Sequence, residues 1–215
     1  MVVRIGDNTG EILDGTSSND TIFGNGGADL LFGRAGTDTL YGGAADDFIV
    51  GGAGGDRIDG GEGADVASYY DAPGGVAVSL ATGQGTAGVA AGDILTLIEN
   101  LSGSAYDDTL VGDGGANTIY GNDAGDDIGG GGGADLLYGG NGNDGLAGGA
   151  GADLLYGGNG DDGFDGGTGA DRIYGGDGRD GVVFFNSASG VTVDLQAGAG
   201  SGGDATGDSY AGIED

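Results

Sequence analysis

A period of nine residues constrains this chain more than any other feature of its sequence. Six nonapeptides follow one another without a gap from Gly15 to Ser68, and nine more run from Gly103 to Val183. Position 1 is Gly in all fifteen, position 8 is apolar in all fifteen, and position 6 is Asp in fourteen and Asn117 in the other. A preceding stretch, Gly6–Asp14, keeps the length but carries Glu11 at position 6, and we interpret it as a degenerate first turn. Such a fixed period indicates a repeat architecture.

A second period of 18 residues lies within the first. Tyrosines recur at this interval at position 9: Tyr120, Tyr138, Tyr156 and Tyr174. Alternate nonapeptides therefore have different surroundings, which predicts a coil built from two nonapeptides. Stacking such coils would place these tyrosines in a ladder along one face.

The glycine content of the repeats excludes helices, because glycine occupies two to four of the nine positions in most of them. The alternative is a turn of about six residues followed by a strand of about three, in which only the middle side chain faces inward. Stacked coils then predict an all-β fold with two parallel sheets and a thin core formed by position 8.

The segments outside the arrays are related to each other. Ser68–Asn100 aligns with Val183–Asp215 at a constant offset of 115 residues, and the alternation in VAVSL and VTVDL predicts strands. We therefore expect β-rich inserts and five segments: 1–14, a terminal cap; 15–68, the first array; 69–102, an insert; 103–183, the second array; and 184–215, a second, apparently truncated insert.

Composition excludes several classes of function. The chain has no His and no Cys, which excludes the common catalytic triads, a His/Cys zinc site and disulfides. Its net charge of −30 with only five basic residues argues against nucleic acid as a partner. No apolar run approaches the length of a membrane helix, and no signal peptide is visible at the start.

Hydrophobic burial alone does not account for folding of the repeats. One Leu or Ile per nonapeptide contributes roughly 1.5–3 kcal/mol, whereas ordering each residue costs about 1–2 kcal/mol of backbone entropy. Calcium, which takes six to eight oxygen ligands from carboxylates and carbonyls, would supply the missing stabilisation. With partners two repeats apart, the arrays of six and nine give four and seven sites, or about eleven ions against the charge of −30.

The repeat G-G-x-G-x-D-x-U-x resembles the RTX, or hemolysin-type, calcium-binding nonapeptide. The resemblance implies a right-handed parallel β-roll in which the Asp side chain and the carbonyls of positions 2 and 4 bind Ca²⁺ between turns. Carried over residue by residue, the metal ligands are Asp20, Gly27, Asp29, Gly36, Asp38, Asp47, Gly52, Gly54, Asp56, Gly61, Gly63, Asp65, Asp108, Asp126, Gly131, Gly133, Asp135, Gly140, Gly142, Asp144, Gly149, Gly151, Asp153, Gly158, Gly160, Asp162, Gly167, Gly169, Asp171, Gly176, Gly178 and Asp180.

Some repeats depart from this pattern. Asn117 lacks the charge, and position 4 is Ala45, Tyr106 or Ala124 in three repeats, where the turn conformation is less certain. The phrase Gly158–Gly163 fits G-x-G-x-x-G, but it lacks the strand-to-helix context of a dinucleotide site. Adjacent acids such as Asp46 and Asp47 follow the repeat phase, which argues against glycosidase carboxylates.

These features predict a non-catalytic calcium-binding module that folds on meeting Ca²⁺ outside the cell. The resemblance implies type I secretion from a Gram-negative bacterium, as the folding and secretion module of a larger secreted protein. Two alternatives remain: a structural, self-associating surface or adhesin protein, and a carbohydrate-binding module that stacks sugars on the tyrosines.

Overall fold

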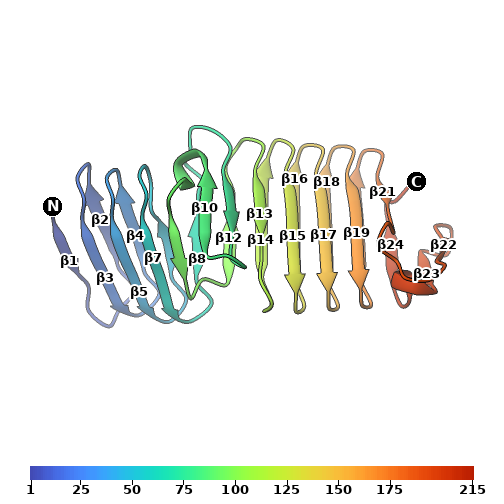
Figure 1. Cartoon of the computed structure of the whole chain (residues 1–215), viewed down its shortest axis with the longest axis horizontal. Helices are drawn as coiled ribbons and strands as arrows, with labels where there is room; N and C mark the ends of the chain where they lie inside the picture. Colours follow the sequence, from blue (N-terminus) through green and yellow to red (C-terminus); the bar gives the residue numbers. More distant parts are fainter. The chain divides into compact units, whose positions relative to one another are not determined.

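The computed structural model describes residues 1–215, which form two compact units, Met1–Ala105 and Tyr106–Asp215. Both units are built from short strands, and the only helical segments are the 3₁₀ turns η1 (Gly88–Ala90) and η2 (Gly203–Ala205). Figure 1 shows the strands of each array running side by side along successive coils. No helix here is long or apolar enough to cross a membrane.

The first unit contains two sheets on opposite sides of the coil. One has the strand order β1 (Val3–Ile5), β3 (Thr21–Gly26), β5 (Thr39–Ala44), β7 (Arg57–Glu62), β11 (Ile94–Thr96), β10 (Gln84–Ala87) and β9 (Ala77–Ser79). The other has β2 (Ile12–Thr16), β4 (Leu30–Arg34), β6 (Phe48–Val50), β8 (Val66–Ser68) and β12 (Asn100–Ser102). The array strands pair in parallel, and β9–β11 turn back in antiparallel pairs.

The second unit repeats this arrangement. One sheet has the order β13 (Thr109–Val111), β15 (Asp127–Gly132), β17 (Gly145–Ala150), β19 (Gly163–Thr168) and β21 (Gly181–Val182). The other has β14 (Thr118–Asp123), β16 (Leu136–Asn141), β18 (Leu154–Asn159), β20 (Arg172–Asp177), β24 (Ser209–Ala211), β23 (Ala199–Ser201) and β22 (Thr192–Asp194). The predicted all-β fold, a parallel β-roll with β-rich inserts, is confirmed.

The register confirms that two nonapeptides form one coil. Leu137 pairs with Leu155 and Tyr138 with Tyr156, so each residue lies beside the residue 18 positions later. Position 8 forms the core, where the side chains of Ile119, Leu137 and Leu155 are fully buried. The core is one side chain deep from each sheet, as the spacing of apolar residues predicts.

The strands are longer than the sequence predicts. Most array strands have six residues rather than three, covering positions 7–9 of one nonapeptide and positions 1–3 of the next, as in β18. Parallel pairing continues through the glycines, since Gly140 lies beside Gly158 and Gly158 beside Gly176. The prediction underestimated the strand because glycine backbones still form sheet hydrogen bonds, and only positions 4–6 form the turn.

Candidate metal centre

The position-6 acids lie inside the coils and not on a solvated surface. Asp144, Asp153 and Asp162 are 3%, 2% and 3% exposed, although each is the last residue of a turn. Asn117 and all fourteen position-6 aspartates are buried in the same way. We call the position-6 residues of one sheet side, taken coil by coil, an acid row. Each unit therefore has two acid rows, one for its odd and one for its even repeats.

One oxygen of each carboxylate connects neighbouring coils. Asp162 Oδ1 accepts the backbone N–H of Asp144 at 2.8 Å, and Asp180 Oδ1 accepts that of Asp162 at 2.9 Å. The same bond recurs at intervals of 18 residues along the rows, including Asn117, whose N–H donates to Asp135 Oδ1. This bond fixes the register of consecutive coils, so position 6 has a structural role before any metal is considered.

The second oxygen has no partner of this kind. Twelve Oδ2 atoms are buried with no hydrogen bond: those of Asp29, Asp38, Asp47, Asp56, Asp65, Asp126, Asp135, Asp144, Asp153, Asp162, Asp171 and Asp180. A buried carboxylate oxygen without a partner is strongly unfavourable, and proteins resolve it by a proton, a cation or a donor. A row of such oxygens fits a row of hard cations.

Burial is the largest influence on the pKa values of the aspartates in the acid rows. It raises the pKa of Asp38, Asp65, Asp135 and Asp162 to about 6, against the lowering effect of the Oδ1 hydrogen bond. In the same way it raises the pKa of Asp126 and Asp171 to about 7. As the pH falls from neutral toward 6, these carboxyls would therefore take up protons unless a cation is bound in their place.

Backbone carbonyls of the preceding coil lie close to the turns that carry the position-6 aspartates. Gly149 and Gly151, at positions 2 and 4, have φ of 101° and 144°, a conformation that side chains disfavour. A Cβ on Gly151 would overlap the carbonyl oxygen of Gly133 and lie 3.3 Å from Asp153 Oδ1. Gly169 repeats this arrangement with the Gly151 carbonyl and Asp171. Carboxylate and carbonyl oxygens thus meet between turns, and this donor set is the one that calcium prefers.

Cation sites of this type need few acidic side chains each. No group of three or more His, Cys, Asp or Glu side chains gathers in the structure. Most ligands of each site would therefore be backbone carbonyls, which the glycine turns present.

Four of the predicted ligand turns differ from the rest. Ala45 and Ala124 adopt left-handed φ of 81° and 75°, so their turns keep the shape that Gly gives elsewhere, at some strain. Tyr106 lies outside that region. Asp20 differs from the other predicted ligands because Thr16 donates to its Oδ2 from both its N–H and its hydroxyl, each at 2.7 Å. The Thr16 hydroxyl lowers the pKa of Asp20, whereas burial raises the pKa of Asp38 and Asp56 in the same row.

Four acids in the inserts extend the rows, and sequence reasoning missed them. Asp93 Oδ1 accepts the N–H of Asp56, and Glu99 Oε2 accepts that of Asp65. Asp208 and Glu214 do the same for Asp171 and Asp180. A signal was present, since Asp93 precedes Leu95 in the same D-x-U phase as the arrays.

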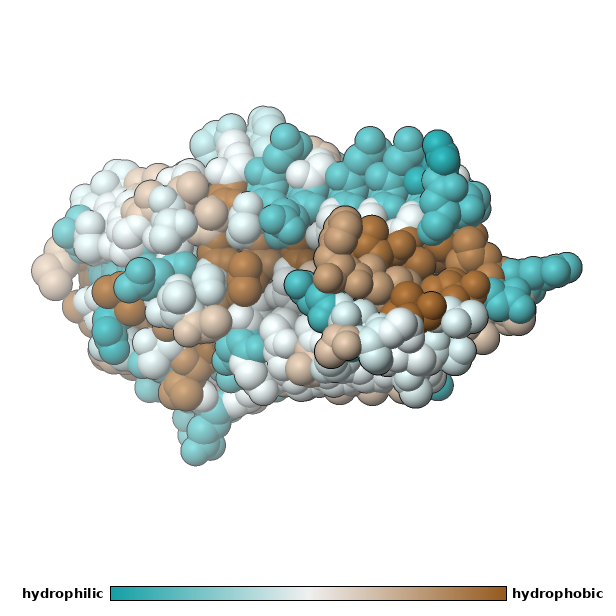
Figure 2. Space-filling view, turned by 45° about the vertical axis from the view of Figure 1, so that its right-hand side comes forward, coloured by the Kyte–Doolittle hydropathy of each residue, from teal (hydrophilic) through white to brown (hydrophobic).

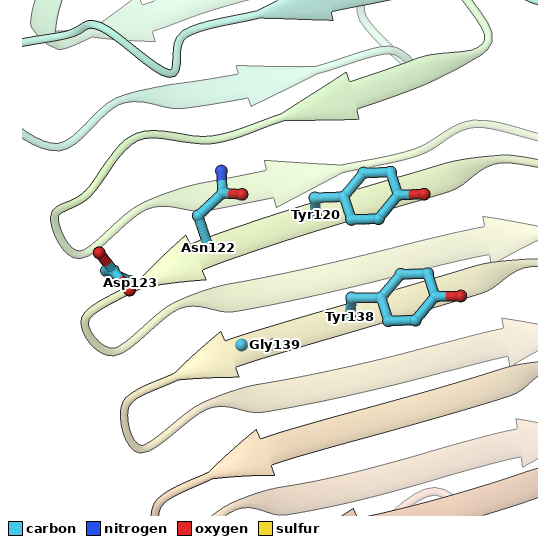
Figure 3. A pocket seen from close by; sticks show the side chains of 6 residues that line it. Tyr120, Asn122, Asp123, Tyr138 and Gly139 are labelled. Atoms are coloured by element: carbon cyan, nitrogen blue, oxygen red, sulfur yellow. The ribbon is translucent and has the colours of Figure 1, made fainter.

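The predicted tyrosine ladder is present along β14, β16, β18 and β20. The ring centroids of Tyr120, Tyr138, Tyr156 and Tyr174 are 4.9–5.1 Å apart, with nearly parallel planes. Figure 3 shows Tyr120 and Tyr138 pointing the same way. Together with Asp123 they line a hollow of about 440 Å³. A sugar between two rings would need a ring spacing of about 7 Å, twice the contact distance of about 3.5 Å. The ladder therefore has no room to hold sugars between its rings.

Hydrophobic residues are not spread evenly over the surface. In the view of Figure 2, brown hydrophobic residues gather in a band bordered by teal hydrophilic ones. Exposed large hydrophobic residues include Val3, Ile5 and Ile12 in β1 and β2, which are 57%, 70% and 70% exposed. These residues lie in the strands at the N-terminal edge of each sheet of the first unit.

Comparison with known families places the arrays among described repeats. The family model for the RTX calcium-binding nonapeptide repeat (4 copies) matches residues 5–40, 32–67, 102–137, 129–164, 138–173 and 156–183. These matches together cover more than half of the chain and leave out most of both inserts. A search of curated proteins finds no match. Repeats of this family bind calcium, are not catalytic in themselves, and are typical of secreted proteins.

Proposed function

The chain belongs to the RTX calcium-binding nonapeptide repeat family, and from this premise we propose that its two arrays fold as calcium arrives. The observation that carries the proposal is the series of buried Oδ2 atoms without partners along the acid rows. Without cations, these carboxylates must be protonated or remain ionised in a poorly solvated interior, and both oppose folding at neutral pH. With cations, the same oxygens become ligands, and binding energy becomes folding energy.

The position-6 aspartates and the carbonyls of positions 2 and 4 would hold the ions, about eleven in all when sites join consecutive coils. Calcium would supply charge neutralisation and a bridge between turns. The chain's own residues have three further roles. The aspartate Oδ1 fixes the register of the coils, the glycines present the backbone carbonyls, and the apolar residues at position 8 form the core.

We further propose that the module works outside the cell, where millimolar calcium drives folding after export through a type I system. In this role it would serve as the folding and secretion module of a larger secreted protein. The family's association with secreted proteins supports this setting. The five-segment division of the chain, with arrays at 15–68 and 103–183, is part of the same proposal.

Far-UV circular dichroism across a calcium titration tests the proposed function. We expect a disordered spectrum in EDTA at pH 7.5 and a β-rich spectrum in millimolar calcium, with magnesium ineffective because it needs stricter octahedral geometry. A spectrum that is the same at both ends of the titration would refute calcium-driven folding. Measuring bound calcium at saturation tests the expected count separately.

A second candidate is a self-associating surface protein. Exposed Val3, Ile5 and Ile12 on edge strands favour it, because such strands can pair with another chain. Calcium-dependent growth in light scattering would support this role, and monomers at all calcium concentrations would exclude it. Replacing Ile5 with Lys should abolish the growth, whereas replacing the exposed polar residue Gln196 should not.

A further inference from the structure

One acid row of each unit ends on an aspartate whose Oδ2 has a different partner from the Oδ2 atoms of the array aspartates. Asp93 and Asp208 accept a backbone N–H on Oδ1 like the array aspartates, from Asp56 at 2.8 Å and Asp171 at 3.0 Å. Their Oδ2 atoms, however, accept tyrosine hydroxyls: Tyr69 donates to Asp93 at 3.0 Å and Tyr210 to Asp208 at 2.9 Å. All four of these side chains are buried.

The two copies achieve this contact from different positions. At the offset of 115 residues, Asp93 corresponds to Asp208, but Tyr69 corresponds to Phe184, and Tyr210 corresponds to Leu95. The tyrosine that donates the hydroxyl therefore stands at different positions in the two copies, whereas the aspartate that accepts it stands at the same position. An incidental contact would not be expected to survive such an exchange, so the hydroxyl on the last aspartate is the feature the two inserts share.

A hydroxyl also closes the other end of one row. In the first unit this row runs through Asp20, Asp38, Asp56 and Asp93. Asp20 has the Thr16 hydroxyl on its Oδ2, whereas the Oδ2 atoms of Asp38 and Asp56 have no partner. Hydroxyl partners therefore occur at the ends of the row and not between them.

The backbone before these aspartates is also different. The 3₁₀ turns η1 and η2 precede Asp93 and Asp208, in place of the glycine turn that precedes the array aspartates. At the place of position 4, Ala91 and Thr206 have φ of −63° and −74°, whereas Gly151 in an array turn has φ of 144°, so the array turn is not formed there. A neutral O–H donor satisfies a buried carboxylate oxygen without needing further ligands.

We propose that Tyr69 and Tyr210 end one row of calcium sites in each unit, with their hydroxyls taking the place of the cation at Asp93 and Asp208. These two aspartates are then the metal-free last members of their acid rows. Tyr69 and Tyr210 act as positioning residues, since they act through the carboxylates. This inference rests on the proposed function, because it concerns where the calcium sites stop.

Calcium stoichiometry of the full chain tests which aspartates hold ions. We expect Asp208→Asn to leave the number of bound calcium ions unchanged, whereas Asp171→Asn, one coil earlier in the same row, lowers it. Equal losses in both variants would overturn the inference. If the unmodified chain binds no calcium, the proposed function itself fails, which is a different outcome.

Moving the hydroxyl tests the role of tyrosine. Tyr210→Phe removes one oxygen and should raise the unfolding equilibrium constant in saturating calcium about tenfold or more. Phe184→Tyr combined with Tyr210→Phe returns the hydroxyl from the position that Tyr69 occupies in the first copy, and should restore stability. The inference is wrong if the double variant is no more stable than Tyr210→Phe, or if Tyr210→Phe has no effect.

Discussion

Asp162→Asn is expected to change the calcium-free and calcium-bound chain in opposite directions. Its Oδ1 accepts the N–H of Asp144, a bond that an Asn oxygen can also accept, and its Oδ2 is buried without a partner. The substitution therefore keeps the link between coils and removes the charge. Under the proposed function, that charge opposes folding without calcium and becomes a calcium ligand when calcium binds.

The magnitude follows from the acidity of the buried carboxyl. Burial raises the pKa of Asp162 from 3.8 to about 6, so the fold prefers the neutral form. The stability this contributes is fully present below pH 3.8 and is lost as the pH rises through about 6. At pH 7.5 an ionised Asp162 destabilises the calcium-free fold by about 3 kcal/mol, at about 1.4 kcal/mol per pH unit. Asn has no ionisable group, so Asp162→Asn removes this destabilisation.

Acid-induced folding in EDTA, followed by circular dichroism, measures the effect. The unmodified chain should gain β-structure as the pH falls from 7.5 to 5, and Asp162→Asn should shift this transition to higher pH. In calcium the variant should instead need more calcium to fold. Asp161→Asn is the matched control, because it removes the same charge from an exposed neighbour whose Oδ1 accepts the N–H of Arg179. Equal shifts in both variants, or no response to acid, would refute the reasoning.

Two further substitutions test the packing of the coils. Gly157→Ala should destabilise the calcium-bound chain by about 1–3 kcal/mol in urea unfolding. A Cβ at this position would overlap Asp162 Oδ2 and lie 2.7 Å from the Gly175 carbonyl oxygen. Gly145→Ala is the control and should be nearly neutral, because its Cβ would meet only ordinary contacts at 3.8 Å. Tyr138→Ala should lower stability by about 1–3 kcal/mol, since it removes two stacked ring contacts of about 0.5–1.5 kcal/mol each. If Tyr138→Ala leaves the urea midpoint unchanged, the ladder does not stabilise the coil.

The repeat phase predicts most of the fold because each position has one dominant physical demand. An apolar residue at position 8 faces inward, as Leu155 does, and the interval of 18 residues places Tyr138 beside Tyr156. Strand length was harder to predict from composition, since glycine weakens strands in general. In these coils Gly158 pairs on both sides, and the neighbouring backbones leave no space for a side chain.

The ends of the acid rows could not be found from the nonapeptide pattern alone. Asp93 and Glu99 lie 37 and 34 residues after the array aspartates whose N–H groups they accept, so no fixed interval identifies them. Asp93 and Glu99 join the acid rows only because the insert stacks on the last coils of the array. The role of Tyr69 could not be predicted from the sequence for the same reason. Its hydrogen-bond acceptor, Asp93, lies 24 residues away, and the residue that corresponds to Tyr69 in the second copy is Phe184.

The two oxygens of one carboxylate explain why position 6 is almost always Asp. Asn117 Oδ1 accepts the N–H of Asp113 within its own turn at 2.9 Å, and the N–H of Asn117 donates to Asp135 Oδ1 in the next coil. What an amide cannot supply is a second anionic oxygen directed into the space between coils. Because Oδ1 fixes the register and Oδ2 is the proposed calcium ligand, the proposed function makes stacking and calcium binding depend on the same side chain. Under that proposal, a coil that lacks its ion keeps a buried carboxylate oxygen without a partner, and we expect folding along each array to be cooperative in calcium.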